Sequence, residues 1–331
     1  MQTLIKTTRA YALVKNEQQR NVLGHAYLLV LDDEQNLRVA LKTFAKLFFD
    51  CDQPVVEREQ RIARLIDQET FCDCLFFPKD EKKFVVEDVD AITEESTLKP
   101  VEGDQKIFII DNFALSTPAA QNKLLKLLEE PPTGVSFLIG TTSAHPVLAT
   151  VLSRVKVLEI PPFAEKDLLT ALQNEHGEKY TPDVYALCAA MSGGSLGTAQ
   201  AMLTGGSYQA LLDEAFTLVE AEENKLPALV KKSGETKRKK ELISLMRTIW
   251  RDAMLVKTEQ ASGANTQKNI LLKTQLSRLQ QLAAARSLSC LLFAQEACSA
   301  AEKQITFNAY FPQCLEVLLA SVLRENKRNL L

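Results

Sequence analysis

The spacing of hydrophobic and polar positions changes near residue 160 and divides the chain into two kinds of structure. Before residue 160, short continuous apolar runs alternate with stretches whose apolar positions recur every three or four residues. Such nearly continuous runs indicate strands of a sheet that is covered on both faces, and they span 27–31, 106–110, 135–139 and 155–160. After residue 160 only helical spacing is found. The pattern predicts an α/β domain followed by all-α material.

Two helices that cross over between strands are predicted at 35–49 and 118–129, because the apolar residues of each stretch fall on one face. The second helix is expected to end before Pro131 and Pro132. Neither proline can donate a backbone hydrogen bond, and a proline disfavours the helical conformation of the residue before it.

Paired prolines and glycines divide the rest of the chain, at 161–162, 193–194 and 205–206. They bracket a small unit of short helices. Longer helical patterns follow, and the last two have broad apolar faces that suit a bundle core or contact with other subunits. We therefore expect three domains: an α/β domain at 1–162, a small helical lid at 163–206 and a helical bundle at 207–331.

Composition indicates an ordinary globular protein, with 331 residues, 46% hydrophobic and 24% charged residues and a net charge of -3. No apolar run approaches the roughly 20 residues of a membrane span, and no signal-peptide core follows Met1. The seven cysteines are scattered and odd in number, as is typical of reduced thiols. We expect a cytoplasmic protein without a disulfide framework. The mild acidity provides no general attraction for nucleic acid.

The strand that ends at Asp111 suggests nucleotide chemistry, because P-loop ATPases hold the metal of the bound nucleotide with a carboxylate at this place. Asn112 follows it and is a poor proton acceptor. In the alternative interpretation, Asp111 only caps a loop or a helix. The stretch 31–38, where a phosphate-binding loop would lie, has no glycine, no lysine and three carboxylates. ATP hydrolysis at this place is not expected.

Five segments in a fixed order carry a resemblance to a known family: 25–28 (HAYL), the Asp111 strand, 121–132 (QNKLLKLLEEPP), 141–142 (TT) and 152–154 (LSR). Together they resemble the bacterial clamp-loader subunits of DNA polymerase III, members of the AAA+ superfamily. The resemblance covers the whole α/β domain and extends to the helical lid. Beyond residue 206 the resemblance rests only on the size of the segment and on its all-helical class.

The resemblance implies a P-loop-type AAA+ domain, a helical lid and a collar bundle that joins a pentameric ring. Such a ring uses ATP to open the sliding clamp and place it on primed DNA. The implied neighbours are motor subunits of the gamma/tau type and a delta-type subunit, with no membrane partner. ATP and magnesium would then be bound by neighbouring subunits, and this chain would bind no cofactor.

The pair Ser153-Arg154 matches a family motif whose arginine reaches the ATP of the neighbouring subunit. The resemblance therefore implies that Arg154 is an arginine finger supplied in trans and that Ser153 supports the motif. A planar, permanently charged guanidinium binds phosphate oxygens in a bidentate manner. Taken alone, an arginine after a helix is usually a solvated charge.

Several family features are degraded in this chain. In the helical lid, Gly197 stands where the motif has an arginine that senses nucleotide. In the α/β domain, Val155 replaces the cysteine of the arginine motif, a change between small apolar side chains that should leave the placement of Arg154 intact. The zinc module of relatives has four cysteines, whereas here Cys51, Cys72 and Cys74 match its spacing poorly and His25 belongs to the first strand. We expect no metal site.

Two functions of different classes remain open at this point. The first is a non-hydrolysing subunit of the DNA polymerase III holoenzyme, without catalysis of its own, that presents Arg154 to a neighbour. The second is a divergent AAA+ ATPase that uses Asp111 and Thr141 or Thr142 around a nonstandard nucleotide pocket. Nucleotide binding by the isolated chain distinguishes them.

Overall fold

The computed structural model describes residues 1–331 except 80–82, 205–207, 237, 263–268, 307–308 and 329–331. The chain forms two compact units, within each of which the residues pack mainly against one another. The first comprises Met1–Ala171 and Ser195–Thr198, and the second comprises Leu172–Gly194 and Ala199–Leu331. The stretch predicted as a helical lid is shared between the two units. The three domain boundaries drawn from the sequence stay a prediction.

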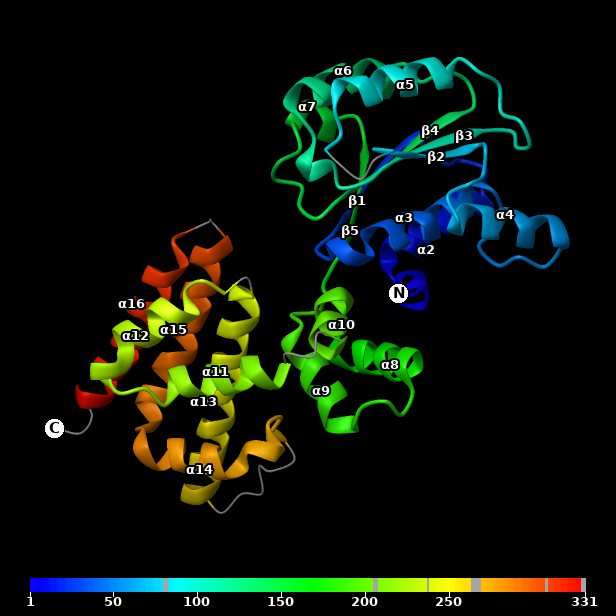
Figure 1. The fold of residues 1–331 in the computed structure, drawn as a ribbon. Helices are drawn as coiled ribbons and strands as arrows, with labels where there is room; N and C mark the ends of the chain where they lie inside the picture. The colour runs from blue at the N-terminus through cyan, green and yellow to red at the C-terminus, as the bar shows by residue number, and fades with distance from the viewer. Residues whose placement is uncertain (80–82, 205–207, 237, 263–268, 307–308, 329–331) are drawn as a thin grey trace. The chain divides into compact units, whose positions relative to one another are not determined.

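A parallel five-stranded sheet forms the centre of the first unit (Figure 1), with strand order β2-β3-β4-β1-β5. The strands are β1 Ala26–Leu31, β2 Cys74–Phe77, β3 Lys106–Ile110, β4 Val135–Thr141 and β5 Lys156–Ile160. Four of them were predicted. The fifth, β2, was missed because it has only four residues and Pro78 follows it.

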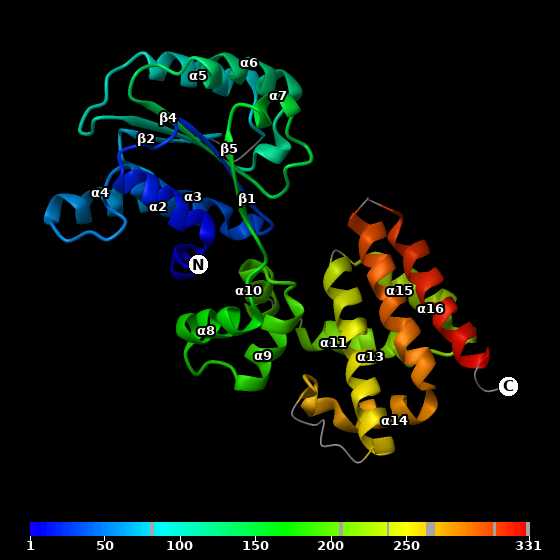
Figure 2. The same cartoon turned by 180° about the vertical axis from the view of Figure 1, so that it is seen from behind.

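Helices cover both faces of this sheet, as the continuous apolar strands require (Figures 1 and 2). On one face pack α1 Gln2–Lys6, α2 Arg9–Gln19, α3 Glu34–Phe48 and α4 Glu57–Asp67. On the other pack α5 Val86–Ser96, α6 Pro118–Glu129 and α7 Ala149–Leu152. Both predicted crossover helices are present. Local chemistry fixes the start of α6, because the Thr117 side chain caps it and Pro118 occupies its first turn.

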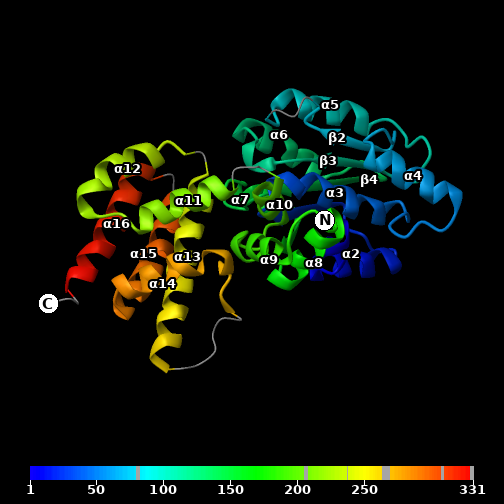
Figure 3. The ribbon, with the colours of Figure 1, turned by 60° about the horizontal axis from the view of Figure 1, so that its bottom comes forward.

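The second unit is helical. A bundle surrounds the long helix α13 (Figure 3), whose buried face includes Ile249 and Trp250 and which packs against α11, α14 and α15. The helices that lie wholly within the second unit are α9 Pro182–Met191, α11 Tyr208–Val219, α12 Leu226–Ser233, α13 Lys239–Ser262, α14 Leu276–Ala285, α15 Leu288–Thr306 and α16 Phe311–Arg328. Helices α8 Glu165–His176 and α10 Leu196–Thr204 cross the division between the units. The predicted fold class, a parallel α/β domain followed by helices, is confirmed.

Within the described part of the chain, no helix combines the length and the apolar character that crossing a membrane requires.

Candidate functional site

The N-terminus of α3 follows β1 at the place where a phosphate-binding loop would lie, and Asp33 occupies it. The Asp33 side chain is buried, and its carboxylate accepts hydrogen bonds from the backbone N–H of Asn36 at 3.2 Å and from the Asn36 side-chain amide at 3.1 and 3.2 Å. Free N–H groups at a helix N-terminus form an anion site. Here the chain supplies its own anion to that site.

Gly197 completes the surroundings of Asp33. Its backbone N–H donates to Asp33 Oδ2 at 2.8 Å, across 164 positions of sequence. A Cβ atom at Gly197 would lie 2.4 Å from Asp33 Oδ1 and 3.0 Å from Asn36 Nδ2. The nucleotide-sensing arginine that the resemblance would place at position 197 therefore has no room while Asp33 occupies its present place. We call this arrangement the Asp33–Gly197 contact.

Asp111 lies after β3, as predicted, and an internal cation pairs with it. Arg38 Nη1, on α3, lies 3.5 Å from Asp111 Oδ2. Arg38 also donates through Nε to Glu69 Oε1 at 2.7 Å, and Lys42 Nζ contacts the same oxygen at 2.7 Å. Burial raises the pKa of Asp111, and the charge of Arg38 opposes that shift. The cluster places a guanidinium beside the carboxylate that would hold a metal ion in an ATPase.

Two further predicted positions have local roles. Asn112 adopts a left-handed backbone conformation with φ 46°, and its side chain donates to Glu34 Oε1 at 2.9 Å. Thr141 is buried at the end of β4, where its hydroxyl donates to the Ser143 carbonyl at 2.7 Å. These contacts shape the loops after β3 and β4. The structure thus pairs Asp111 with Arg38, Asn112 with Glu34 and Gly197 with Asp33. The hydroxyl of Thr141 instead bonds to Ser143, within its own loop.

Arg154 follows α7 at the far end of the motif, with 32% of its side chain exposed. Its Nε donates to Glu129 Oε1 at 2.6 Å, and Nη2 contacts the same carboxylate. Nη1 donates to the Thr150 carbonyl at 2.8 Å and to Ser153 Oγ at 3.0 Å. Ser153 therefore contacts the guanidinium directly, and its role in the motif stays a prediction.

The cysteines considered for zinc differ in their surroundings. Cys51 and Cys74 are buried, whereas Cys72 is exposed. Burial raises the pKa of the Cys51 thiol to about 12 and raises that of Cys74 as well, which disfavours the thiolate that zinc needs. His25 Nε2 contacts the Leu128 carbonyl at 3.0 Å. Among the described residues, no three His, Cys, Asp or Glu side chains are grouped to hold a metal ion.

Arg38 and Glu69 were not among the predicted site residues. The sequence carried one partial signal, since Arg38 ends the stretch that replaces the phosphate-binding loop. Glu69 gave no signal, because its contact with Arg38 spans 31 positions and depends on how α3 packs against the chain that follows α4.

The Glu69 ion pair predicts a pH-dependent contribution to stability. Arg38 hydrogen bonding lowers the pKa of Glu69 to about 2, so the pair stabilises the fold above the ordinary carboxyl pKa of about 4.5, and this stabilisation is lost as pH falls toward 2. We expect Glu69→Gln to reduce the free energy of unfolding by about 1–2 kcal/mol at pH 7, since the pair is partly exposed. Urea unfolding at pH 7 and pH 3 measures this difference, which should shrink by about half or more at pH 3.

The matched control is Glu94→Gln, which removes an exposed carboxylate from α5 in the same unit. A Glu69→Gln effect equal to that of Glu94→Gln, or one independent of pH, would contradict the prediction.

Residues 6–164 match the family model described as DNA polymerase III, delta subunit. The chain is 36% identical over 127 residues to DNA polymerase III subunit delta' of Escherichia coli, covering 38% of this chain and 37% of the relative. It is 32% identical over 113 residues to subunit gamma/tau of Mycobacterium tuberculosis, covering 33% of this chain and 20% of the relative. The chain therefore spans between a fifth and two fifths of the length of these relatives.

Similar solved structures include a gamma-subunit-related protein of Thermotoga maritima, with 17% identity, a TM-score of 0.44 and coverage of 97% of this chain and 100% of that one. The Bacillus subtilis clamp-loader delta protein has 13% identity, a TM-score of 0.33 and coverage of 95% and 99%.

Proposed function

Residues 6–164 are homologous to the clamp-loader subunits of DNA polymerase III, and from this premise we propose that the chain is a delta-prime-like subunit of a bacterial clamp loader. In this role it does not hydrolyse ATP, and it supplies Arg154 in trans to ATP held by a neighbouring motor subunit. The proposed partners are gamma/tau-type motor subunits, a delta-type subunit and, through the complex, the sliding clamp and primed DNA. The observation that carries the non-hydrolysing role is the Asp33–Gly197 contact.

The electrostatics of this contact disfavour a nucleotide. A triphosphate at the start of α3 would have to displace the Asp33 carboxylate, which is buried and receives hydrogen bonds from Asn36 and Gly197. A phosphate placed beside an Asp33 that stayed would meet like charge at close range in a low dielectric. The Arg38 guanidinium beside Asp111 opposes magnesium binding in the same way.

The position of Arg154 supports a role toward a neighbour. Its side chain is partly exposed after the end of α7, and it bonds to Glu129 on α6, to Thr150 on α7 and to Ser153. A permanently charged guanidinium at the surface can meet a phosphate brought by another subunit.

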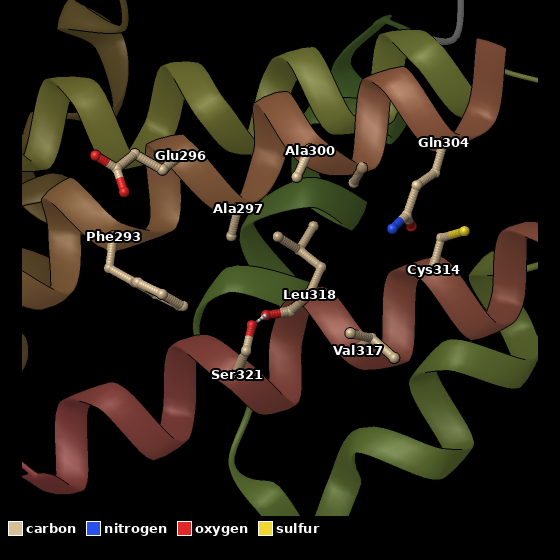
Figure 4. Close-up of a pocket in the computed structure, with 10 residues that line it drawn as sticks. Phe293, Glu296, Ala297, Ala300, Gln304, Cys314, Val317, Leu318 and Ser321 are labelled. Carbon is tan, nitrogen blue, oxygen red and sulfur yellow. Dashed lines mark hydrogen bonds between the residues drawn. The ribbon is translucent and has the colours of Figure 1, made fainter. Parts of the chain in front are cut away.

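The second unit has a surface suited to the collar role that the family resemblance implies. Helices α15 and α16 border a groove of about 330 Å³ lined by Phe293, Ala297, Ala300, Val317 and Leu318 among others (Figure 4). Leu292 and Val317 expose 49% and 59% of their surface on these helices. Exposed apolar area of this kind is typical of subunit contacts.

ATP binding by the isolated chain tests the non-hydrolysing role. We expect a calorimetric titration with Mg-ATP to give no dissociation constant below about 1 mM, because an internal carboxylate occupies the phosphate position. Asp33→Asn is the informative companion, since it keeps the shape of the cap and removes the charge. Tight magnesium-dependent binding by the unchanged chain would overturn the proposal and favour a divergent ATPase with its own nucleotide site.

A further inference from the structure

Arg154 is almost fully occupied by partners within its own chain. A guanidinium has five N–H groups. Nε and Nη2 face Glu129, while Nη1 donates to the Thr150 carbonyl and to Ser153 Oγ. These four contacts leave one N–H of Nη2 for any further acceptor. The edge formed by Nε and Nη2, one of the two that can bind an oxyanion in a bidentate manner, already holds a carboxylate.

Glu129 lies at the C-terminus of α6, where a nearby cation stabilises a carboxylate. It is the last residue of α6, and the carbonyl groups at a helix C-terminus repel negative charge. Helices α6 and α7 lie side by side on one face of the sheet (Figure 1), so Arg154, two residues after the end of α7, can reach the end of α6. Arg154 offsets both the Glu129 charge and the helix terminus. Glu130 is the next residue, and its side chain is exposed; of these two carboxylates, Arg154 pairs with Glu129.

From these contacts we propose that Glu129 is a positioning residue for Arg154: it holds the Nε and Nη2 edge of the guanidinium in the free chain and gives it up to the phosphate of the neighbour's ATP. The inference rests on the proposed function, because the incoming phosphate is the one that Arg154 would contact in trans. Both anions offer oxygen acceptors to the Nε and Nη2 edge, which Glu129 Oε1 occupies in the free chain. Removing the negative charge of Glu129 therefore makes Arg154 easier to recruit.

The first experiment concerns the isolated full-length chain and does not depend on any partner. In 15N spectra of arginine side chains, the Arg154 Nε–H signal is expected to exchange slowly with water in the unchanged chain and in Glu130→Gln. In Glu129→Gln its exchange should be at least about threefold faster, because an amide is a weaker acceptor than a carboxylate. Equal exchange in Glu129→Gln and Glu130→Gln would overturn the pairing on which the inference depends.

The second experiment measures steady-state ATP hydrolysis by the complex reconstituted with gamma/tau-type and delta-type subunits. Glu129→Gln is expected to lower the KM for ATP about two- to fivefold, the range for a partly exposed ion pair, with kcat within about twofold of the unchanged complex. Glu130→Gln should leave both constants unchanged. An unchanged or raised KM in Glu129→Gln overturns the inference.

Arg154→Ala in the same assay separates this inference from the proposed function. If Arg154→Ala leaves kcat unchanged, the proposed arginine finger is wrong, and the exchange with phosphate falls with it. If Arg154→Ala lowers kcat while Glu129→Gln leaves KM unchanged, the finger stands and only the role of Glu129 is overturned. Circular dichroism checks that all three variants are folded.

Discussion

Replacing Arg154 by alanine is expected to slow ATP hydrolysis by about 100-fold or more at the motor site that this arginine contacts under the proposed function. An arginine finger stabilises the charge that develops on the transferring phosphoryl group, and such residues are worth about 10³–10⁵ in turnover. Single-turnover hydrolysis in the reconstituted complex, with primed DNA and clamp present, measures the effect. Clamp loading should fall with it. If the proposed complex holds ATP at several motor subunits, its steady-state rate as a whole should fall less than the rate at this one site.

Two companion variants determine what the alanine result means. Arg154→Lys keeps the charge but loses the bidentate fork, so it should recover only a small part of the activity. Arg20→Ala removes another exposed arginine from the same unit and should hydrolyse ATP at the unchanged rate. Clamp loading by Arg154→Ala at the rate of the unchanged complex would show that the arginine finger assignment is wrong.

The fold could be predicted where the signal is local. Largely apolar strands of five or more residues can be recognised from the sequence, and the cap Thr117 and the stop at Pro131 lie next to α6 in the sequence. Strand β2 could not be recognised in the same way, because four residues followed by a proline are too short to show a pattern. Its place in the sheet comes from pairing with β3, a contact between segments about 30 residues apart.

The candidate site could be predicted as a set of positions but not as a set of contacts. Sequence reasoning identified Asp111, Gly197 and Arg154, and it used the carboxylates of 31–38 only as evidence against a phosphate-binding loop. The structure pairs each position with a distant partner: Arg38 for Asp111, Asp33 for Gly197 and Glu129 for Arg154. Such pairings depend on which strand ends meet and how helices pack, and no local pattern encodes them.

The Asp33–Gly197 contact predicts the second large effect, on stability. We expect Asp33→Ala to lower the free energy of unfolding of the first unit by about 2–3 kcal/mol. Loss of the cap of α3 accounts for about 1 kcal/mol, and the buried N–H of Gly197, left without its acceptor, for about 1–2 kcal/mol more. Urea unfolding measures the total. Hydrogen exchange at the Gly197 amide should report the local change, since that amide loses its protecting bond.

Asp32→Ala is the matched control, because Asp32 is the exposed neighbour of Asp33. It should change the free energy of unfolding by less than about 0.5 kcal/mol and leave exchange at Gly197 as it is. An Asp33→Ala variant that behaves like Asp32→Ala would show that the carboxylate does not bind Gly197 in solution. The start of α3 would then be open to an external anion such as the phosphate of a nucleotide. Protection of Gly197 in the unchanged chain and its loss in Asp33→Ala alone would instead support Asp33 as the anion that occupies the phosphate position.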